Sequence, residues 1–230
     1  ALPYELYADE HIRKYGFHGT SHRYVSGRAA EILGKEEGFT GVTCHLGNGC
    51  SLTAVKDGHS VDTSMGLTPL EGVVMGTRSG DIDPAIIFHL AESRGMELAE
   101  INQLLQRKSG LLGVSGVSND LREIMEAASG GDHRAELAID IYAYRVRKYI
   151  GSYLAALGGA DAIIFTGGVG ENGVDMRRRI LQGLDRLGMV FDAERNEACR
   201  GEEGDISAPD SPIKLLVIPT NEELLIARDT

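Results

Sequence analysis

Residues 44–51, CHLGNGCS, constrain the fold more than any other stretch of this sequence. They lie between two short runs rich in β-branched and apolar residues, and a second tight turn at Asp57-Gly58 leads into a third run at 59–64. This pattern predicts three antiparallel strands joined by short turns. Two glycines flank Asn48, so the first turn can adopt positive φ angles and bring bare backbone N–H groups close to a phosphate. An ordinary hairpin is the alternative interpretation of this stretch alone.

The composition favours a soluble globular α/β protein. The chain has 230 residues, of which 42% are hydrophobic and 25% charged, and its 30 glycines gather in turns between apolar runs. Glycines clustered in this way favour an α/β fold with functional loops over a helical bundle. The formal net charge of −11 argues against a nucleic acid as partner.

The cysteines and the apolar runs indicate a cytoplasmic protein. Cys44, Cys50 and Cys199 have no zinc-ligand spacing, and their odd number argues against a disulfide framework. We expect Cys44 and Cys50 to be small strand residues in a reducing compartment, although they could face each other across the hairpin. No stretch has the pattern of a signal peptide or the length of a membrane span, so no membrane partner is expected.

Helices are predicted in the middle of the chain. The longest periodic segment, 132–157, has apolar residues at every fourth position, with Leu137 among those that support them, and predicts a core helix. Ser21 or Thr20 is expected to cap an earlier helix that ends at Gly34. Two more helices are expected at about 84–94 and 97–108, a loop at 110–118, and a cap of the following helix at Asn119 or Asp120.

Two continuous apolar runs, 161–166 and 213–218, predict buried parallel strands. The first leads into the glycine-rich loop 167–172, which is followed by a helix from about 173 to 187. Open α/β sheets bind their ligands in such loops, at the carboxyl ends of the strands. The sequence therefore predicts antiparallel strands, then helices, then two strand–loop–helix units.

Two side chains in glycine-rich loops are candidates for catalysis. His18 lies in Phe17-His18-Gly19, where an imidazole can donate a hydrogen bond to a transferring phosphoryl group. Arg78 lies between Thr77 and Ser79, and its guanidinium matches the geometry of phosphate or carboxylate. The alternative for His18 is a purely structural role. The alternative for Arg78 is a surface ion pair with Asp81 or Asp83.

Further candidates lie at predicted helix starts. Asp120 is explained by capping, whereas Leu121 and Arg122 are suited to sandwich an adenine between apolar contact and planar stacking. Thr220 and Glu223 have capping-box spacing, which leaves Glu222 as the carboxylate that could hold Mg²⁺ through water. The helix dipole is an equally good reason for Glu222. The chain has neither a Walker A sequence nor a protein-kinase catalytic loop, so any phosphoryl transfer uses a different scaffold.

Taken together, these segments resemble the acetate kinase family. The matching segments run in order along the whole chain: KYGFHGTSH at 14–22, HLGNG at 45–49, TSMG at 63–66, TPLEG at 68–72, MGTR at 75–78, FTGGVGEN at 165–172 and PTNEE at 219–223. The resemblance implies a ribonuclease-H-like, actin-like ATPase domain. Its mixed sheet would begin with three antiparallel strands and be flanked by helices. It also implies Mg²⁺- or Mn²⁺-dependent transfer of phosphate from ATP to acetate, giving acetyl phosphate and ADP, in a homodimer.

The resemblance assigns roles to particular residues. His18 and Arg78 would stabilise the transferring phosphoryl group, and Glu222 would serve the metal. Phe17 and Pro69 would line the apolar pocket for the acetate methyl group. The residues expected to bind the nucleotide are His45, Leu46, Gly47, Asn48, Gly49, Asp120, Leu121, Arg122, Gly168, Val169, Gly170, Glu171 and Asn172.

The family enzyme is longer at its N-terminus than this chain. We therefore expect residues 1–220 to form its second, nucleotide-binding domain and 221–230 a helix that packs on the first domain, with no catalysis by this chain alone. A propionate kinase remains open because much of the pocket wall would lie outside the chain. A non-catalytic nucleotide-binding module remains a third hypothesis, but it gives no role to His18 or Arg78.

Overall fold

The computed structural model describes residues 1–229 and contains a six-stranded mixed sheet. The strand order is β3-β2-β1-β4-β6-β5. The strands are β1 (Thr40–Leu46), β2 (Cys50–Lys56), β3 (His59–Thr63), β4 (Ala162–Thr166), β5 (Gly204–Asp205) and β6 (Lys214–Val217). The first three strands pair in antiparallel fashion, whereas β1, β4 and β6 run parallel to one another. Both predictions about the strands are confirmed.

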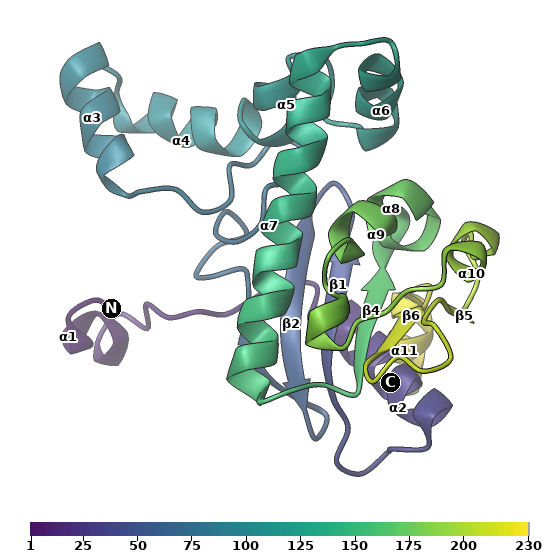
Figure 1. The fold of residues 1–230 in the computed structure, drawn as a ribbon. Coiled ribbons are helices and arrows are strands. Elements are labelled where there is room, and N and C mark those ends of the chain that lie inside the picture. The colour runs from purple at the N-terminus through teal and green to yellow at the C-terminus, as the bar shows by residue number, and fades with distance from the viewer. Residues whose placement is uncertain (230) are drawn as a thin grey trace.

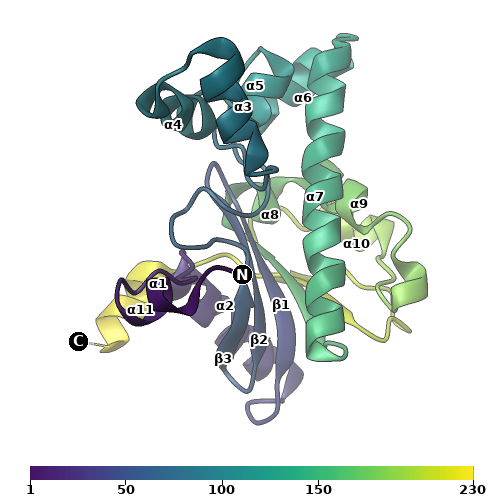
Figure 2. The ribbon, with the colours of Figure 1, turned by 90° about the vertical axis from the view of Figure 1, so that its left-hand side faces the viewer.

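Helices cover both faces of the sheet (Figure 1), and others lie beyond its end (Figure 2). They are α1 (Tyr4–Ala8), α2 (Gly19–Leu33), α3 (Ala85–Arg94), α4 (Leu98–Arg107), α5 (Gly110–Ser115), α6 (Leu121–Ser129), α7 (His133–Leu157), α8 (Gly167–Asn172), α9 (Val174–Leu181), α10 (Ala193–Ala198) and α11 (Glu222–Asp229). The long α7 runs along one face and contacts β1 and β2, while α2 and α11 lie on the other face (Figure 1). In Figure 2 the same layers are seen from the side, and α3 and α4 project beyond the end of the sheet.

Strand alternation divides the core into two parts. On β4, Ile163 and Phe165 face the cluster that includes α7, whereas Ala162 and Ile164 face the cluster that includes α2. Successive side chains of a strand point to opposite faces, so a continuous apolar run is what a strand covered on both sides requires. Cys44 and Cys50 are buried, unpaired strand residues in the first cluster, as expected. Cys50 lies opposite Leu46 in the β1–β2 register and does not face Cys44.

The predicted ends of the longest helix are confirmed. Asp132 accepts hydrogen bonds from the backbone N–H groups of Arg134 and Ala135, and Gly158 ends the helix in the left-handed conformation at φ 76°. Leu137 was expected in the apolar stripe, but its side chain is 45% exposed, so this detail is wrong. The stripe that packs on the sheet runs through Tyr142, Val146 and Ile150 without it.

The start of α2 differs from the prediction. Neither Thr20 nor Ser21 caps the helix; the cap position is His18, which has left-handed backbone geometry at φ 59°. Ser21 is fully buried, and its hydroxyl is hydrogen-bonded to a ring nitrogen of His45 instead. Gly34 ends the helix in the left-handed conformation, as predicted.

Three segments expected as loops or caps are organised differently. Segment 110–118 contains α5, and the glycine-rich 167–172 is itself a helix, α8, followed by α9 and a short 3-10 turn rather than one long helix. The capping box predicted from Thr220 and Glu223 does not form, because the buried Thr220 hydroxyl has no hydrogen-bond partner among residues 1–229. The predicted last helix, 221–230, corresponds to α11, and its final residue lies outside the described part of the chain. No helix within 1–229 has the length and apolar character needed to cross a membrane.

Candidate functional site

The candidate site lies at the carboxyl ends of the three parallel strands. β1 leads into the turn 47–49, β4 into α8, and β6 into residues 218–221 before α11. Because these strands run side by side in the same direction, all three connections meet at one edge of the sheet. This is the edge at which the sequence predicts ligands.

The turn 47–49 is held closely by neighbouring loops. The backbone carbonyl of Asn48 accepts a hydrogen bond from Gly76 at 3.1 Å, and its side-chain oxygen accepts one from the Asn119 amide at 3.1 Å. Residues 47, 48 and 49 all have negative φ angles, so the prediction that the glycines allow positive φ angles in this turn is wrong. Gly49 is needed for space, since a Cβ there would lie 3.3 Å from His18 Nε2 and 3.5 Å from Arg78 Nη2.

His18 stands directly beside this turn. Its Nδ1 is 2.9 Å from Ser51 Oγ, and its ring stacks on that of His45 with 4.2 Å between the ring centroids. Burial, together with the neighbouring His45 and Arg78, lowers the pKa of His18 to about 4, against an opposing effect of Glu222. The imidazole is therefore neutral near pH 7, with its Nε2 directed toward Gly49 and Arg78.

Arg78 is oriented by a backbone carbonyl. Its Nη1 donates to Pro69 O at 2.8 Å, which leaves Nη2 close to Gly49 and His18. The proposed alternative, an ion pair with Asp81 or Asp83, does not describe the structure. Asp81 instead accepts from Arg145 and from the Tyr149 hydroxyl, and Asp83 accepts from the backbone of the helix start.

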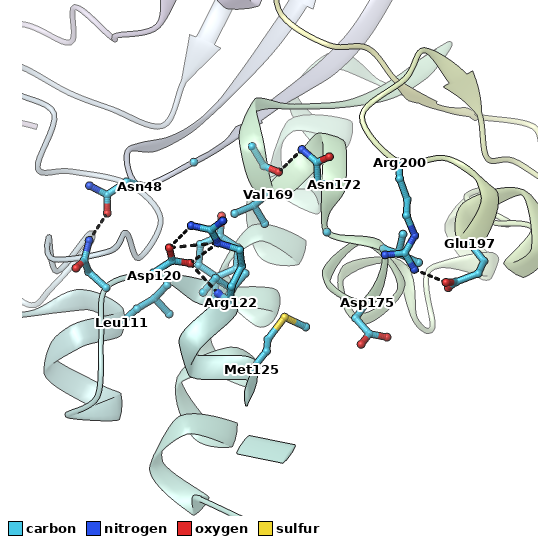
Figure 3. A pocket seen from close by; sticks show the side chains of 17 residues that line it. Asn48, Leu111, Asp120, Arg122, Met125, Val169, Asn172, Asp175, Glu197 and Arg200 are labelled. Carbon is cyan, nitrogen blue, oxygen red and sulfur yellow. Dashed lines mark hydrogen bonds and ion pairs between the residues drawn. The ribbon is translucent and has the colours of Figure 1, made fainter. Parts of the chain in front are cut away.

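A cavity of about 710 Å³ extends from the turn toward α6, α8 and α10. This volume suits a nucleoside-sized ligand. Figure 3 shows polar and apolar side chains from both sides pointing into it. The lining residues are Gly47, Asn48, Leu111, Asn119, Asp120, Leu121, Arg122, Met125, Tyr142, Gly168, Val169, Asn172, Gly173, Val174, Asp175, Glu197 and Arg200.

Eight of the residues predicted to bind the nucleotide line this cavity. Among the others, His45 lies under the turn with Nδ1 2.8 Å from Ser21 Oγ, and burial lowers the pKa of its imidazole. Leu46 is a fully buried core residue. The cavity residues that the sequence analysis missed include Leu111, Met125 and the exposed ion pair Glu197–Arg200. No sequence signal marks the ion pair, because α10 and the residues after it reach the cavity only through the tertiary fold.

Asp120 and Arg122 form an exposed pair at the cavity wall. Asp120 caps α6 by accepting from the Arg122 backbone at 2.9 Å, and the two side chains are joined at 2.6 Å. Hydrogen bonds from Arg122 lower the pKa of Asp120 to about 2. Leu121 contributes to the core cluster as well as to the cavity.

Glu171 faces the protein backbone and does not line the cavity. Its Oε1 accepts from the N–H groups of Gly167 at 2.9 Å and Thr220 at 3.2 Å, and it also lies 3.4 Å from the Thr166 hydroxyl. The carboxylate therefore ties the β4–α8 connection to the β6–α11 connection. Gly170 is buried against Phe165 and does not line the cavity either.

Arg177 was missed by the sequence analysis although it organises the same region. Its guanidinium is fully buried and donates to the carbonyl oxygens of Gly170 at 2.8 Å, Glu171 at 2.9 Å and Cys199 at 2.6 Å. It also donates to the side chain of Asn196 at 2.8 Å. This residue joins the end of α8 to α10 and the loop after it, and so holds together the segments on one side of the cavity.

The remaining predicted residues lie around His18 and Arg78. Phe17 precedes His18 and is 38% exposed, and Pro69 is bonded to Arg78 through its carbonyl. The Glu222 carboxylate is close enough to raise the pKa of His18. Within residues 1–229, no group of three or more His, Cys, Asp or Glu side chains could hold a metal ion.

Comparisons with known proteins find relatives along the whole chain. A model described as the acetokinase family matches residues 1–228. The chain is 58% identical over 231 residues to the acetate kinase of Acetivibrio thermocellus, and the match covers 100% of this chain and 58% of that protein. The chain therefore spans a little more than half the length of this relative.

Two solved structures are similar over the whole chain. The acetate kinase of Porphyromonas gingivalis matches with a TM-score of 0.96 at 51% identity, covering 100% of this chain and 58% of that one. A propionate kinase from Francisella tularensis subsp. tularensis SCHU S4 matches with a TM-score of 0.94 at 49% identity, also covering 100% and 58%.

Proposed function

Since this chain belongs to the acetokinase family, we propose that it is part of an enzyme that phosphorylates acetate with ATP. A carboxylate oxygen of acetate attacks the γ-phosphorus, the bond to the β,γ-bridging oxygen breaks, and acetyl phosphate and ADP are formed reversibly. One observation supports this proposal above others. His18 Nε2 and Arg78 Nη2 converge on Gly49, which directly follows Gly47 and Asn48 in the lining of a cavity of about 710 Å³.

The two side chains suit the charge that develops during transfer. The transferring phosphoryl group carries negative charge on three equatorial oxygens, and positioned donors stabilise it without covalent chemistry. Arg78 offers a permanent positive charge that is already oriented by Pro69. His18 offers a ring nitrogen of a neutral imidazole, because the pKa of His18 is lowered to about 4.

The nucleoside is proposed to occupy the cavity between α6 and α8. Gly47 and Asn48 would approach its phosphates, and Asp120, Leu121 and Arg122 would contact the adenosine from one side. Gly168, Val169 and Asn172 would contact it from the other side. His45, Leu46, Gly170 and Glu171 would act through the shape of the backbone, since their side chains bond or pack elsewhere.

The residues present fit a magnesium ion that arrives with the nucleotide. Mg²⁺ in such sites is usually held by one or two carboxylates together with phosphate oxygens and water. Glu222, placed near His18, is the carboxylate proposed to hold it, and Mn²⁺ would fit the same ligands. When bound, the metal would neutralise charge on the β- and γ-phosphate oxygens.

Residues 1–220 are proposed to form the nucleotide-binding domain, with 221–230 a helix that contacts the rest of the enzyme. The chain matches only 58% of the relative's length, which supports a contribution to the active site from outside it. Calorimetry should show weak binding of MgATP to this chain. A hydroxamate assay should detect acetyl phosphate only when the chain is extended to the length of its relatives. Full turnover by the chain alone would refute the division into domains.

A pair of glycine variants tests the nucleotide site directly. Gly168 lines the cavity and Gly151 lies on α7 outside it, and a Cβ on either residue meets no atom within 4 Å. Gly168→Leu should therefore fill part of the cavity and weaken MgATP binding by about tenfold or more. Gly151→Leu should leave binding unchanged. Equal binding by both variants would remove the nucleotide from this cavity.

Propionate is a second candidate acceptor, because a propionate kinase is among the similar structures. Phe17 and Pro69 flank His18 and Arg78, and we propose that they line the pocket for the acceptor's alkyl group. One methylene changes specificity by only about 1–3 kcal/mol. The ratio of kcat/KM for acetate and propionate in the extended enzyme decides between the two acceptors.

We also propose a cytoplasmic homodimer. The helix α3 has no buried residue among those described, and it exposes 41% of Ile86 and 64% of Phe88. An exposed apolar helix of this kind is suited to a subunit contact. Light scattering should detect dimers that Phe88→Ser weakens and that Val61→Ser, on β3, does not. The three free cysteines fit a reducing compartment.

A further inference from the structure

A buried row of hydrogen-bonding groups extends from His18 into the protein. Ser51 Oγ lies between two imidazoles, 2.9 Å from His18 Nδ1 and 2.7 Å from His22 Nε2. On its other side, His22 Nδ1 is 2.7 Å from Thr43 Oγ1, which in turn lies 3.4 Å from the carbonyl oxygen of Thr53. Thr43 and Ser51 are fully buried and His22 is 4% exposed, so water does not compete for these bonds.

This row can be protonated in two ways when both imidazoles are neutral. The Ser51 hydroxyl has one proton, so it donates to one histidine and accepts from the other. If it accepts from His18, then both histidines carry their proton on Nδ1, and Thr43 donates to Thr53 O. If it donates to His18, then both histidines carry their proton on Nε2, and Thr43 donates to His22.

We propose that His22 and Ser51 are positioning residues that set the tautomer of His18 and supply it, in neutral form, with an outward Nε2–H. This inference rests on the proposed phosphoryl transfer. Phosphoryl oxygens only accept hydrogen bonds, so His18 contributes to the reaction only when Nε2 bears the proton. The arrangement with both protons on Nε2 loses only the hydrogen bond from Thr43 to Thr53 O, which at 3.4 Å is the longest and weakest of the row.

The surroundings keep the row uncharged. His45 and Arg78 face His18 and disfavour a positive charge there, whereas the Glu222 carboxylate opposes them. His18 and His45 are the titratable neighbours of His22 and act in the same sense. With burial added, the pKa of His18 is about 4 and that of His22 about 3. Proton placement within the row is thus a choice of tautomer at neutral pH.

A purely structural role for His22 makes a different prediction. A satisfied core histidine would need only its own two hydrogen bonds, and its tautomer would be independent of His18. The row instead couples the two rings through a single hydroxyl proton. Both imidazoles must then carry their protons on the same kind of nitrogen, whether a ligand is bound or not.

Nitrogen NMR of the histidine rings tests this coupling in the intact chain. Long-range ¹H–¹⁵N correlation of ¹⁵N-histidine-labelled protein distinguishes Nδ1–H from Nε2–H. His18 and His22 should show matching tautomers in the free chain, and both should show Nε2–H in the extended enzyme with MgADP and aluminium fluoride, which mimics the planar phosphoryl group. Unlike tautomers in the wild-type protein would overturn the proposal without any variant.

Two serine variants provide a matched pair. Ser51 and Ser64 are both fully buried, but the Ser64 hydroxyl accepts from the Leu52 backbone at 2.9 Å and belongs to a separate hydrogen bond. Ser51→Ala should uncouple the two tautomers, and Ser64→Ala should not. In the extended enzyme, Ser51→Ala should lower kcat by about tenfold or more with little change in nucleotide KM.

The NMR measurement and the kinetic measurement separate this inference from the proposed function. If no protein, wild-type included, makes acetyl phosphate, the proposed function fails while the tautomers still decide the coupling. If Ser51→Ala retains both wild-type tautomers and wild-type kcat, the positioning role is refuted. His22→Gln, whose amide can still donate to Ser51, should keep more activity than His22→Leu if positioning is correct.

Discussion

The two ends of the proposed site, where we place the phosphoryl group and the nucleoside, are built in different ways. At the phosphoryl end, Ser51 and Thr43 are fully buried and bonded to neighbouring side chains. At the nucleoside end, Arg122 has a side chain that is 90% exposed and is paired with the adjacent cap residue Asp120. The first group of residues is fixed before any ligand arrives, whereas the second can rearrange around one.

From this difference we expect catalysis to depend on the phosphoryl end and nucleotide binding on the nucleoside end. Donors fixed in a water-poor site stabilise developing charge at no reorganisation cost, so their loss should appear in kcat. Exposed ion pairs are screened by solvent and contribute little, so their loss should appear as a modest change in affinity. Substitutions at the two ends can therefore test whether kcat and nucleotide affinity depend on different residues.

Arg78→Ala should have the largest effect. It removes the positive charge that Pro69 O holds beside Gly49, and kcat in the extended enzyme should fall by about a thousandfold. Arg107, the charged neighbour that helps to lower the pKa of Arg78, provides the control. Arg107→Ala should retain kcat to within a few-fold. An unchanged kcat in Arg78→Ala would remove this residue from the mechanism.

Gly49→Ala should come next because it blocks the same space. Its methyl group would lie 3.3 Å from His18 Nε2 and 3.5 Å from Arg78 Nη2, where the phosphoryl group is proposed to sit. We expect kcat to fall by about 10- to 100-fold with the fold intact. Gly27, inside α2, meets no atom within 4 Å of an added Cβ. Gly27→Ala should keep activity and stabilise the protein by about 0.5–1 kcal/mol.

Much of the scaffold was predictable because local signals agree with the tertiary structure. The turn at 47–49 separates two strands of clear β character, and the apolar stripe of α7 matches the face that packs on the sheet. Gly34 and Asp120 end and begin their helices as their residue types indicate. At Gly34 and Asp120 the local conformation depends on the type of one residue, a glycine that adopts positive φ and a carboxylate that caps a helix.

The wrong predictions lie where distant residues decide the local conformation. The glycines of 167–172 argue against a helix, yet two side chains hold α8 by hydrogen bonds. Glu171, within α8, accepts from the N–H of Gly167, and Arg177, on α9, donates to the carbonyl oxygen of Gly170. The left-handed His18 and the buried row beneath it depend on Ser51, 33 positions away along the chain. Sequence reasoning identified His18 but had no means to connect it with His22.

Acid should destabilise the phosphoryl end more than the nucleoside end. Burial lowers the pKa of His22 from 6.5 to about 3, so between these values the unfolded chain binds the proton and the folded chain does not. Stability from this residue is complete above about pH 6.5 and is lost as pH falls toward 3. The loss should be about 2 kcal/mol at pH 5. Asp120 keeps its own contribution down to about pH 3.8, because the pKa of its carboxyl falls from 3.8 to about 2 on folding, so it adds no loss between pH 7 and pH 5.

Urea unfolding of the wild-type chain and of His22→Gln at pH 7 and pH 5 measures this effect. His18 and His45, which face His22, are present in both proteins, so the difference between the two pH dependences isolates His22. The wild-type chain should lose more stability between the two pH values than the variant. Equal losses would show that His22 is not held neutral by the fold.

Arg122→Ala should have the smallest effect, and it tests the nucleoside end of the proposed site. The Arg122 guanidinium is exposed and already paired with Asp120, so it offers adenine a stacking surface that solvent also reaches. We expect MgATP binding to weaken by about two- to fivefold, with kcat unchanged in the extended enzyme. Arg28, which forms a similar exposed ion pair with Glu203 outside the cavity, is the matched control, and Arg28→Ala should bind as the wild type does. A large loss of kcat in Arg122→Ala would mean that the nucleoside end also orders the reacting groups, and the division between fixed catalysis and adaptable binding would fail.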